Sequence, residues 1–216
     1  MAVSIPGGSF LTSLLNVISQ SLLIPVIVLL LIFAFYVVIS LGSLIAEYTS
    51  RKEVPIKEID SLIENIDKSN SVEEVRGHIQ NAKINKSQKK ILFKILDSED
   101  LSYEAKETLA TRLVERREEL VNKKLRRTDI IVRVGPTLGL MGTLIPLGSG
   151  LAALKTGDIN TLADSLTVAF DTTVVGIGAG ALAYYISKIR SGWYDQYLDN
   201  LDTLTDSVLN FFKNRF

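Results

Sequence analysis

The residues of this sequence that could do chemistry inside a membrane are one carboxylate and three hydroxyls. Asp171, Thr172, Thr173 and Thr143 all lie within long apolar runs. An ionisable side chain deep in a spanning helix costs about 2.5–3.5 kcal/mol on insertion scales, so Asp171 is expected to face a cavity, a partner or a proton path. Hydroxyls at one depth, repeated around a symmetric oligomer, would form a polar ring that wets a pore or coordinates a hydrated cation. Alternatively, each threonine bonds a preceding carbonyl or joins neighbouring helices.

The direction in which these side chains point follows from helical geometry. Thr143 lies at a membrane depth similar to that of Thr172 and Thr173 if their two helices run antiparallel from a tip near Gly157. Asp171 and Thr173 are two positions apart, which is about 200° around a helix. If Thr173 lines a pore, Asp171 therefore faces away from it, toward a neighbouring helix or subunit.

The two apolar runs form a predicted transmembrane hairpin. They cover 132–154 and 162–186 and are separated by the polar turn 155–160. Each is close to the roughly 20 apolar residues that cross a bilayer. Small residues within both runs let helix backbones approach closely, so the hairpin is expected to face other helices. The residues predicted to pack helices are Pro136, Gly139, Gly142, Gly176 and Gly180.

The whole chain is predicted to be an all-α polytopic membrane protein with three transmembrane helices and a helical cytoplasmic region. The first spanning helix has Pro25 in its first turn and is expected to be retained as an anchor, since no signal-peptide cleavage pattern follows it. Residues before it either form an interfacial helix or are a disordered lead-in. The predicted segments are 1–20, N-terminal; 21–46, 130–155 and 161–189, transmembrane; 47–129, cytoplasmic insertion; and 190–216, cytoplasmic C-terminal helix.

The insertion is rich in charged residues, and its apolar residues recur at helical spacing. This pattern predicts amphipathic helices over 56–66, 72–84, 87–96 and 102–125, the last of which continues into the second spanning helix. The C-terminal helix is expected to pack on the insertion or on neighbouring copies.

The distribution of lysine and arginine predicts the orientation of the chain in a cell (inner or plasma) membrane. Most of the positive charge lies in 51–127, which ends in a juxtamembrane basic run, and more follows the third span. The N-terminal segment is uncharged and the hairpin tip carries little positive charge. By the positive-inside rule, the N-terminus is expected outside and the C-terminus in the cytoplasm.

Composition argues against several other classes. The chain has 24 basic and 24 acidic residues, so no overall basic excess favours nucleic acid as a partner. It has no cysteine, and its single histidine, His78, lies in no metal-ligand pattern. We find no nucleophile paired with a base and no phosphate-binding loop, so an enzyme, a cofactor or a metal site is not expected.

Two motifs of the hairpin resemble the core of the MotA/TolQ/ExbB proton channel family. They are Gly135-Pro136 with Gly139-Leu140-Met141-Gly142-Thr143, and Ala169-Phe170-Asp171-Thr172-Thr173-Val174-Val175-Gly176. The order of anchor, cytoplasmic insertion, hairpin and tail is also similar. The sequence departs from some members at Val168, where they carry a glutamate, and whether Asp171 substitutes for it stays open.

The resemblance implies a pentamer around a pore that holds a single-spanning partner similar to ExbD, TolR or MotB, with an essential membrane aspartate. It implies that a proton or sodium gradient drives the complex, that Thr143 and Thr173 are the pore threonines, and that Pro136 opens the second spanning helix. The alternative hypothesis is a non-conducting membrane scaffold whose cytoplasmic helices recruit partners.

Overall fold

The computed structural model describes residues 8–51, 54–98 and 100–215, and within them the protein is helical with no strand. This confirms the predicted all-α fold class. The helices are α1 (Gly8–Ser50), α2 (Ile56–Lys68), α3 (Val72–Asn81), α4 (Lys86–Leu96), α5 (Tyr103–Leu154) and α6 (Ile159–Arg215). They form two compact units. The spanning unit contains 8–47 and 126–188, and the polar unit contains 48–125 and 189–215, apart from the undescribed positions.

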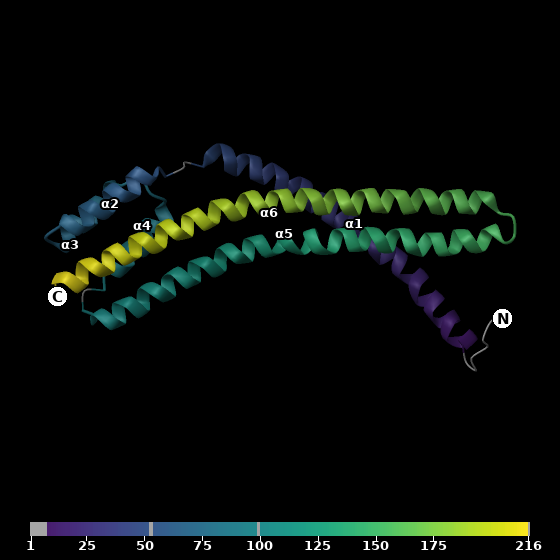
Figure 1. Ribbon diagram of the computed structural model, residues 1–216, viewed down its shortest axis with the longest axis horizontal. Coiled ribbons are helices and arrows are strands. Elements are labelled where there is room, and N and C mark those ends of the chain that lie inside the picture. Colours follow the sequence, from purple (N-terminus) through teal and green to yellow (C-terminus); the bar gives the residue numbers. More distant parts are fainter. Residues whose placement is uncertain (1–7, 52–53, 99, 216) are drawn as a thin grey trace. The chain divides into compact units, whose positions relative to one another are not determined.

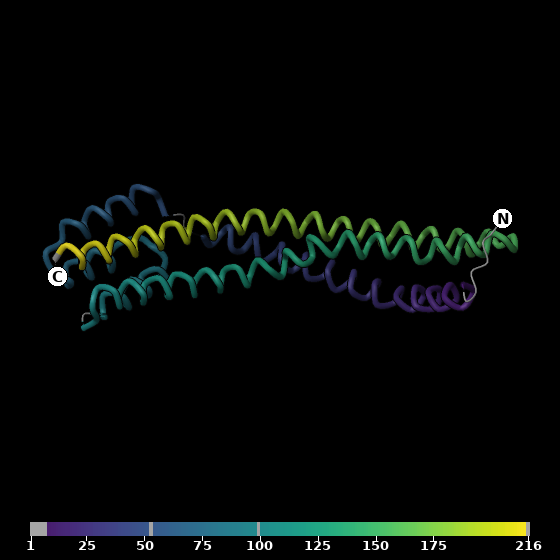
Figure 2. Tube along the Cα trace, turned by 60° about the horizontal axis from the view of Figure 1, so that its bottom comes forward, coloured from purple at the N-terminus to yellow at the C-terminus, as the bar shows by residue number. Residues whose placement is uncertain are grey.

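The spanning unit is built on the predicted hairpin. The two arms of the hairpin are the C-terminal part of α5 and the N-terminal part of α6, which lie side by side and antiparallel in both views (Figures 1 and 2). The turn between them needs a left-handed residue, which Gly157 supplies with φ of 78°. Asp158 then caps α6 by accepting a 3.1 Å hydrogen bond from the Thr161 backbone N–H.

Helix α1 packs with one face on one side of this hairpin, and the other faces of α1 are mostly exposed. Val26 and Leu30 are buried against Leu138, with Met141 and Val175 at the edge of the contact. Most of its remaining large apolar side chains are exposed, which suits contact with lipid. By length and composition, α1, α5 and α6 can each cross a membrane.

Helix α1 differs from the sequence prediction at its beginning. Residues 8–20 are helical and continuous with the first span, because no charged or helix-breaking residue interrupts them; residues 1–7 of the predicted N-terminal segment lie outside the described residues. Pro25 therefore lies in the interior of α1, so its predicted place in the first helical turn is wrong. Whether 8–20 lies along a membrane surface stays a prediction.

The polar unit has its own apolar core. Helices α2, α3 and α4 pack with the first part of α5 and the last part of α6, which contributes Leu204, Val208 and Phe212. The four predicted amphipathic helices are confirmed, although α3 ends at Asn81, before Ile84. Ser71 caps α3 by accepting a hydrogen bond from the Glu74 N–H. The predicted continuation of the fourth amphipathic helix into the second span is also confirmed, since α5 has no break.

Candidate functional site

The two arms of the hairpin touch backbone to backbone at glycines. A Cβ atom placed on Gly176 would lie 2.7 Å from both the Gly139 Cα and the Gly135 carbonyl oxygen. One placed on Gly180 would lie 2.8 Å from Cδ of Pro136. Side chains larger than hydrogen therefore do not fit here without moving a helix. The structure brings together four of the five residues predicted to pack helices.

The fifth, Gly142, packs against a predicted pore residue. A Cβ on Gly142 would lie 2.5 Å from Cβ and Oγ1 of Thr172, a residue that is only 7% exposed. The Thr172 hydroxyl donates to the carbonyl oxygens of Val168 and Ala169 at 2.9 and 3.0 Å. Thr172 thus lies inside the contact between α5 and α6, where it has the packing role that threonines often have in membranes.

Thr143 and Thr173 lie on the side of the hairpin opposite α1. Met141 on α5 and Val175 on α6 lie at the α1 contact. Thr143 is two positions from Met141 and Thr173 is two positions from Val175, which turns each threonine about 200° around its helix from that contact. Both are half-buried. Their hydroxyls donate within their own helices, from Thr143 to the Leu140 carbonyl at 2.6 Å and from Thr173 to the Ala169 carbonyl at 3.0 Å. Each oxygen keeps acceptor capacity for a water or an ion.

Asp171 points in a different direction. It precedes Val175 by four positions, about 40° around α6, so it lies on the side of α6 that carries the α1 contact residue. Its side chain is exposed, and no described residue gives it a hydrogen bond or an ion pair. Asp171 therefore does not share a face with Thr173.

A polar pair that was not predicted from the sequence lies further along the face of the hairpin that carries Thr143 and Thr173, which we call the threonine face. The Ser187 hydroxyl donates a 2.5 Å hydrogen bond to Oδ1 of Asp129, which joins α6 to α5. Asp129 precedes Thr143 by two heptads and Ser187 follows Thr173 by two heptads. Two heptads turn a helix to within about 40° of the starting direction and advance it by about 21 Å. The heptad spacing of polar residues on both arms was the available signal.

Pro136 lies inside α5, whose first residue is Tyr103. The implied role of opening the second spanning helix is therefore wrong for this chain, because α5 enters the span as a continuation of the polar unit. The pyrrolidine ring instead packs on Gly180. Proline inside a spanning helix is tolerated where neighbouring helices cover the freed carbonyl.

Comparison with known proteins places this hairpin in a family. The sequence model of the MotA/TolQ/ExbB proton channel family matches residues 71–203, more than half of the chain, and the chain belongs to that family. No curated protein matches the chain. The family consists of membrane proton channels of the motor type that work with partner proteins in membrane complexes. With its three apolar helices, this protein is a multi-pass membrane protein.

Proposed function

We propose that this member of the MotA/TolQ/ExbB family is the ring-forming, ion-conducting subunit of a membrane motor. In this proposal a proton or sodium gradient drives ions through the ring, and the ring energises a single-spanning partner similar to ExbD, TolR or MotB that carries a membrane aspartate. The ring is a pentamer, the N-terminus lies outside the cell membrane, and the polar unit and C-terminus lie in the cytoplasm. The subunit transports ions and is not an enzyme.

The observation that carries this proposal is the common face of Thr143 and Thr173. Both side chains lie on the side of the hairpin away from α1, and both keep oxygen lone pairs free for a ligand. In a closed ring with α1 on the outside, this face turns inward. Two hydroxyls from every copy would then line the pore at one depth.

Asp171 supports assembly in a second way. A charged side chain exposed to hydrocarbon costs several times the thermal energy. Asp171 is exposed in the single chain, and Asp164 and Thr167, at helical spacing, are exposed with it. A neighbouring subunit or water in the assembled complex must cover this face.

Ion flux in vesicles tests the proposal. The protein, co-reconstituted with a single-spanning protein encoded beside it, is expected to pass protons or sodium down an imposed gradient. Thr173→Val and Thr143→Val keep the side-chain shape and remove the oxygen, and we expect each to lower the flux at least tenfold. Thr137→Val is the matched control, because its hydroxyl also bonds within its own helix, to the Arg133 carbonyl, but lies off the threonine face.

Two results would contradict this mechanism. Flux that survives in both Thr143→Val and Thr173→Val would exclude the threonine ring. Native mass spectrometry that finds a monomer or dimer unable to take up the partner would exclude the motor subunit, and the membrane scaffold would take its place.

A further inference from the structure

The polar unit carries a stripe of aspartates along α6. Asp195, Asp199, Asp202 and Asp206 follow one another at spacings of four, three and four, which places them on one face of the helix. All four are exposed. The sequence from 191 to 212 contains no lysine or arginine that could neutralise them.

Helix α2 extends this acidic face. Its residues Asp60, Glu64 and Asp67 line a depression of about 470 Å³ together with Asp206 of α6. Partial burial in this depression raises the pKa of Asp206 above its ordinary value, and repulsion from Asp202 and Glu107 adds to the effect. We call the four aspartates of α6 and these three acids of α2 the acidic surface.

Most of the acidic surface forms no ion pair within the part of the chain that the structure describes. Glu64 pairs with Lys68. Asp199, Asp202 and Asp206 make no ion pair with any residue that the structure describes. Like charges this close repel one another, so a cation supplied from outside the chain would relieve the repulsion.

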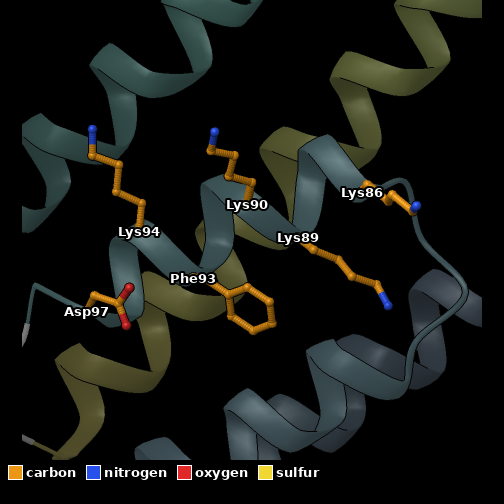
Figure 3. Close-up of a pocket in the computed structure, with 6 residues that line it drawn as sticks. All are labelled: Lys86, Lys89, Lys90, Phe93, Lys94 and Asp97. Carbon is orange, nitrogen blue, oxygen red and sulfur yellow. The ribbon is translucent and has the colours of Figure 1, made fainter.

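Helix α4 carries the opposite charge. It contains Lys86, Lys89, Lys90 and Lys94 and no acidic residue. With Phe93 and Asp97 these lysines line a depression of about 440 Å³, and Figure 3 shows their ammonium groups spreading outward from the helix in different directions. Asp97 is paired with Arg76. Lys89 donates to the Gln80 carbonyl at 2.7 Å, and none of the four forms an ion pair among the described residues. We call the four lysines the lysine surface.

We propose that the acidic surface of one copy binds the lysine surface of the next copy around the ring. The inference rests on the proposed ring and adds the contact that joins its polar units. The two surfaces come from different helices of one unit, so each copy offers one of each, as a head-to-tail interface in a closed ring requires. A second copy would set four lysines against the acidic surface and carboxylates against the lysine surface, so each surface would gain opposite charges.

The contact between polar units does not depend on strong individual ion pairs. Exposed ion pairs are individually weak. The spanning helices of a ring already hold neighbouring copies together, so their polar units meet at a high effective concentration. The contact then sets the register between copies more than it sets the affinity.

Cross-linking between engineered cysteines tests the contact, because the natural chain has no cysteine. Full-length Lys90→Cys/Asp202→Cys protein in membranes is treated with a homobifunctional maleimide. We expect a ladder of linked chains, since every copy then has a reactive group on both interfaces. Either single variant can give at most a linked pair. Lys90→Cys/Thr111→Cys, with the second cysteine on the exposed part of α5, is the matched control and should give no ladder.

Charge reversal separates the proposed contact from simple proximity. In the double-cysteine background, Lys94→Glu is expected to lower the yield of linked chains at least fivefold. Adding Asp206→Lys to the same chain should restore the yield, because one charge on each side of the interface is then reversed and the two new charges again attract. Raising the salt concentration should lower the unreversed yield as well.

Copy number measured by native mass spectrometry distinguishes the possible failures. A ring without a ladder overturns the contact and leaves the proposed function standing. A protein that does not assemble overturns both. A ladder that ignores Lys94→Glu, with lost binding to anionic phosphatidylglycerol vesicles in that variant, would assign the lysine surface to lipid and overturn the contact between copies.

Discussion

Replacing Gly176 by alanine is the sharpest test of how the hairpin is held together. The added Cβ would lie 2.7 Å from the Gly139 Cα, 2.9 Å from the Gly139 nitrogen and 2.7 Å from the Gly135 carbonyl oxygen. Carbon atoms in contact normally lie about 3.5–4.0 Å apart. The atoms that meet the methyl group belong to the backbone of a helix, so the two arms must separate by about 1 Å.

The size of the effect follows from two opposing contributions. Overpacking costs about 1–3 kcal/mol. Alanine gains about 1 kcal/mol over glycine in helix propensity. Gly178→Ala serves as the reference variant, since Gly178 lies in the same helix and a Cβ there would meet nothing within 4 Å. It gains the same helix propensity without overpacking, so the difference between the two variants isolates the overpacking cost. We therefore expect Gly176→Ala to be less stable than Gly178→Ala by about 1–3 kcal/mol.

The measurement is the free energy of unfolding of both variants in mixed micelles as the denaturing detergent fraction rises. A difference of this size changes the folded-to-unfolded ratio by about 5- to 150-fold, which such a titration resolves. Equal stability of the two variants would refute the close backbone contact between Gly139 and Gly176.

Three further perturbations test other parts of the structure. Asp158→Ala should destabilise the hairpin at neutral pH, because the hydrogen bonds from the Thr161 side chain and backbone lower the pKa of Asp158 in the folded state. That stabilisation is present above the unfolded pKa of about 3.8 and is lost as the pH falls through the folded value. The melting temperatures of variant and parent should therefore converge in acid, and a gap that stays constant with pH would contradict the prediction. Ser187→Ala removes the hydrogen bond to Asp129 and should lower the free energy of unfolding by about 1.5 kcal/mol, whereas an unchanged value would show that water replaces it. Ser71→Ala removes the cap of α3 and should cost about 1 kcal/mol in denaturant melts, with Ser71→Asp, which keeps an acceptor, close to the parent.

Sequence reasoning predicted the elements well because their signals are local. Apolar runs of spanning length and apolar residues at helical spacing fix where α2, α4 and the hairpin lie. The turn at Gly157 was equally visible, since polar residues interrupt two apolar runs there. The helix beginnings were harder: Pro25 and Pro136 both suggested a start, yet each lies inside a longer helix because no competing cap or break precedes it.

The site was predicted only in part because direction depends on which helix packs on which face. Thr143, Thr172 and Thr173 look alike in sequence. The structure assigns Thr172 to the helix contact and turns Thr143 and Thr173 away from α1. That distinction required the α1 contact at Leu138 and Val175, which no local pattern encodes. The pair of Asp129 and Ser187 was missed for a similar reason, since its two residues are 58 positions apart.

The arrangement of polar groups along the hairpin has a consequence for how ions could leave the membrane. Thr143 and Thr173 carry only hydroxyls, which coordinate a cation without holding its charge. The first carboxylate on the same face is that of Asp129, already bound to Ser187 and about 21 Å away. That distance is too long for direct transfer, so an ion that passes the threonines must cross it through water or along the partner helix. A pore that lacks the partner should therefore conduct poorly even with every threonine in place.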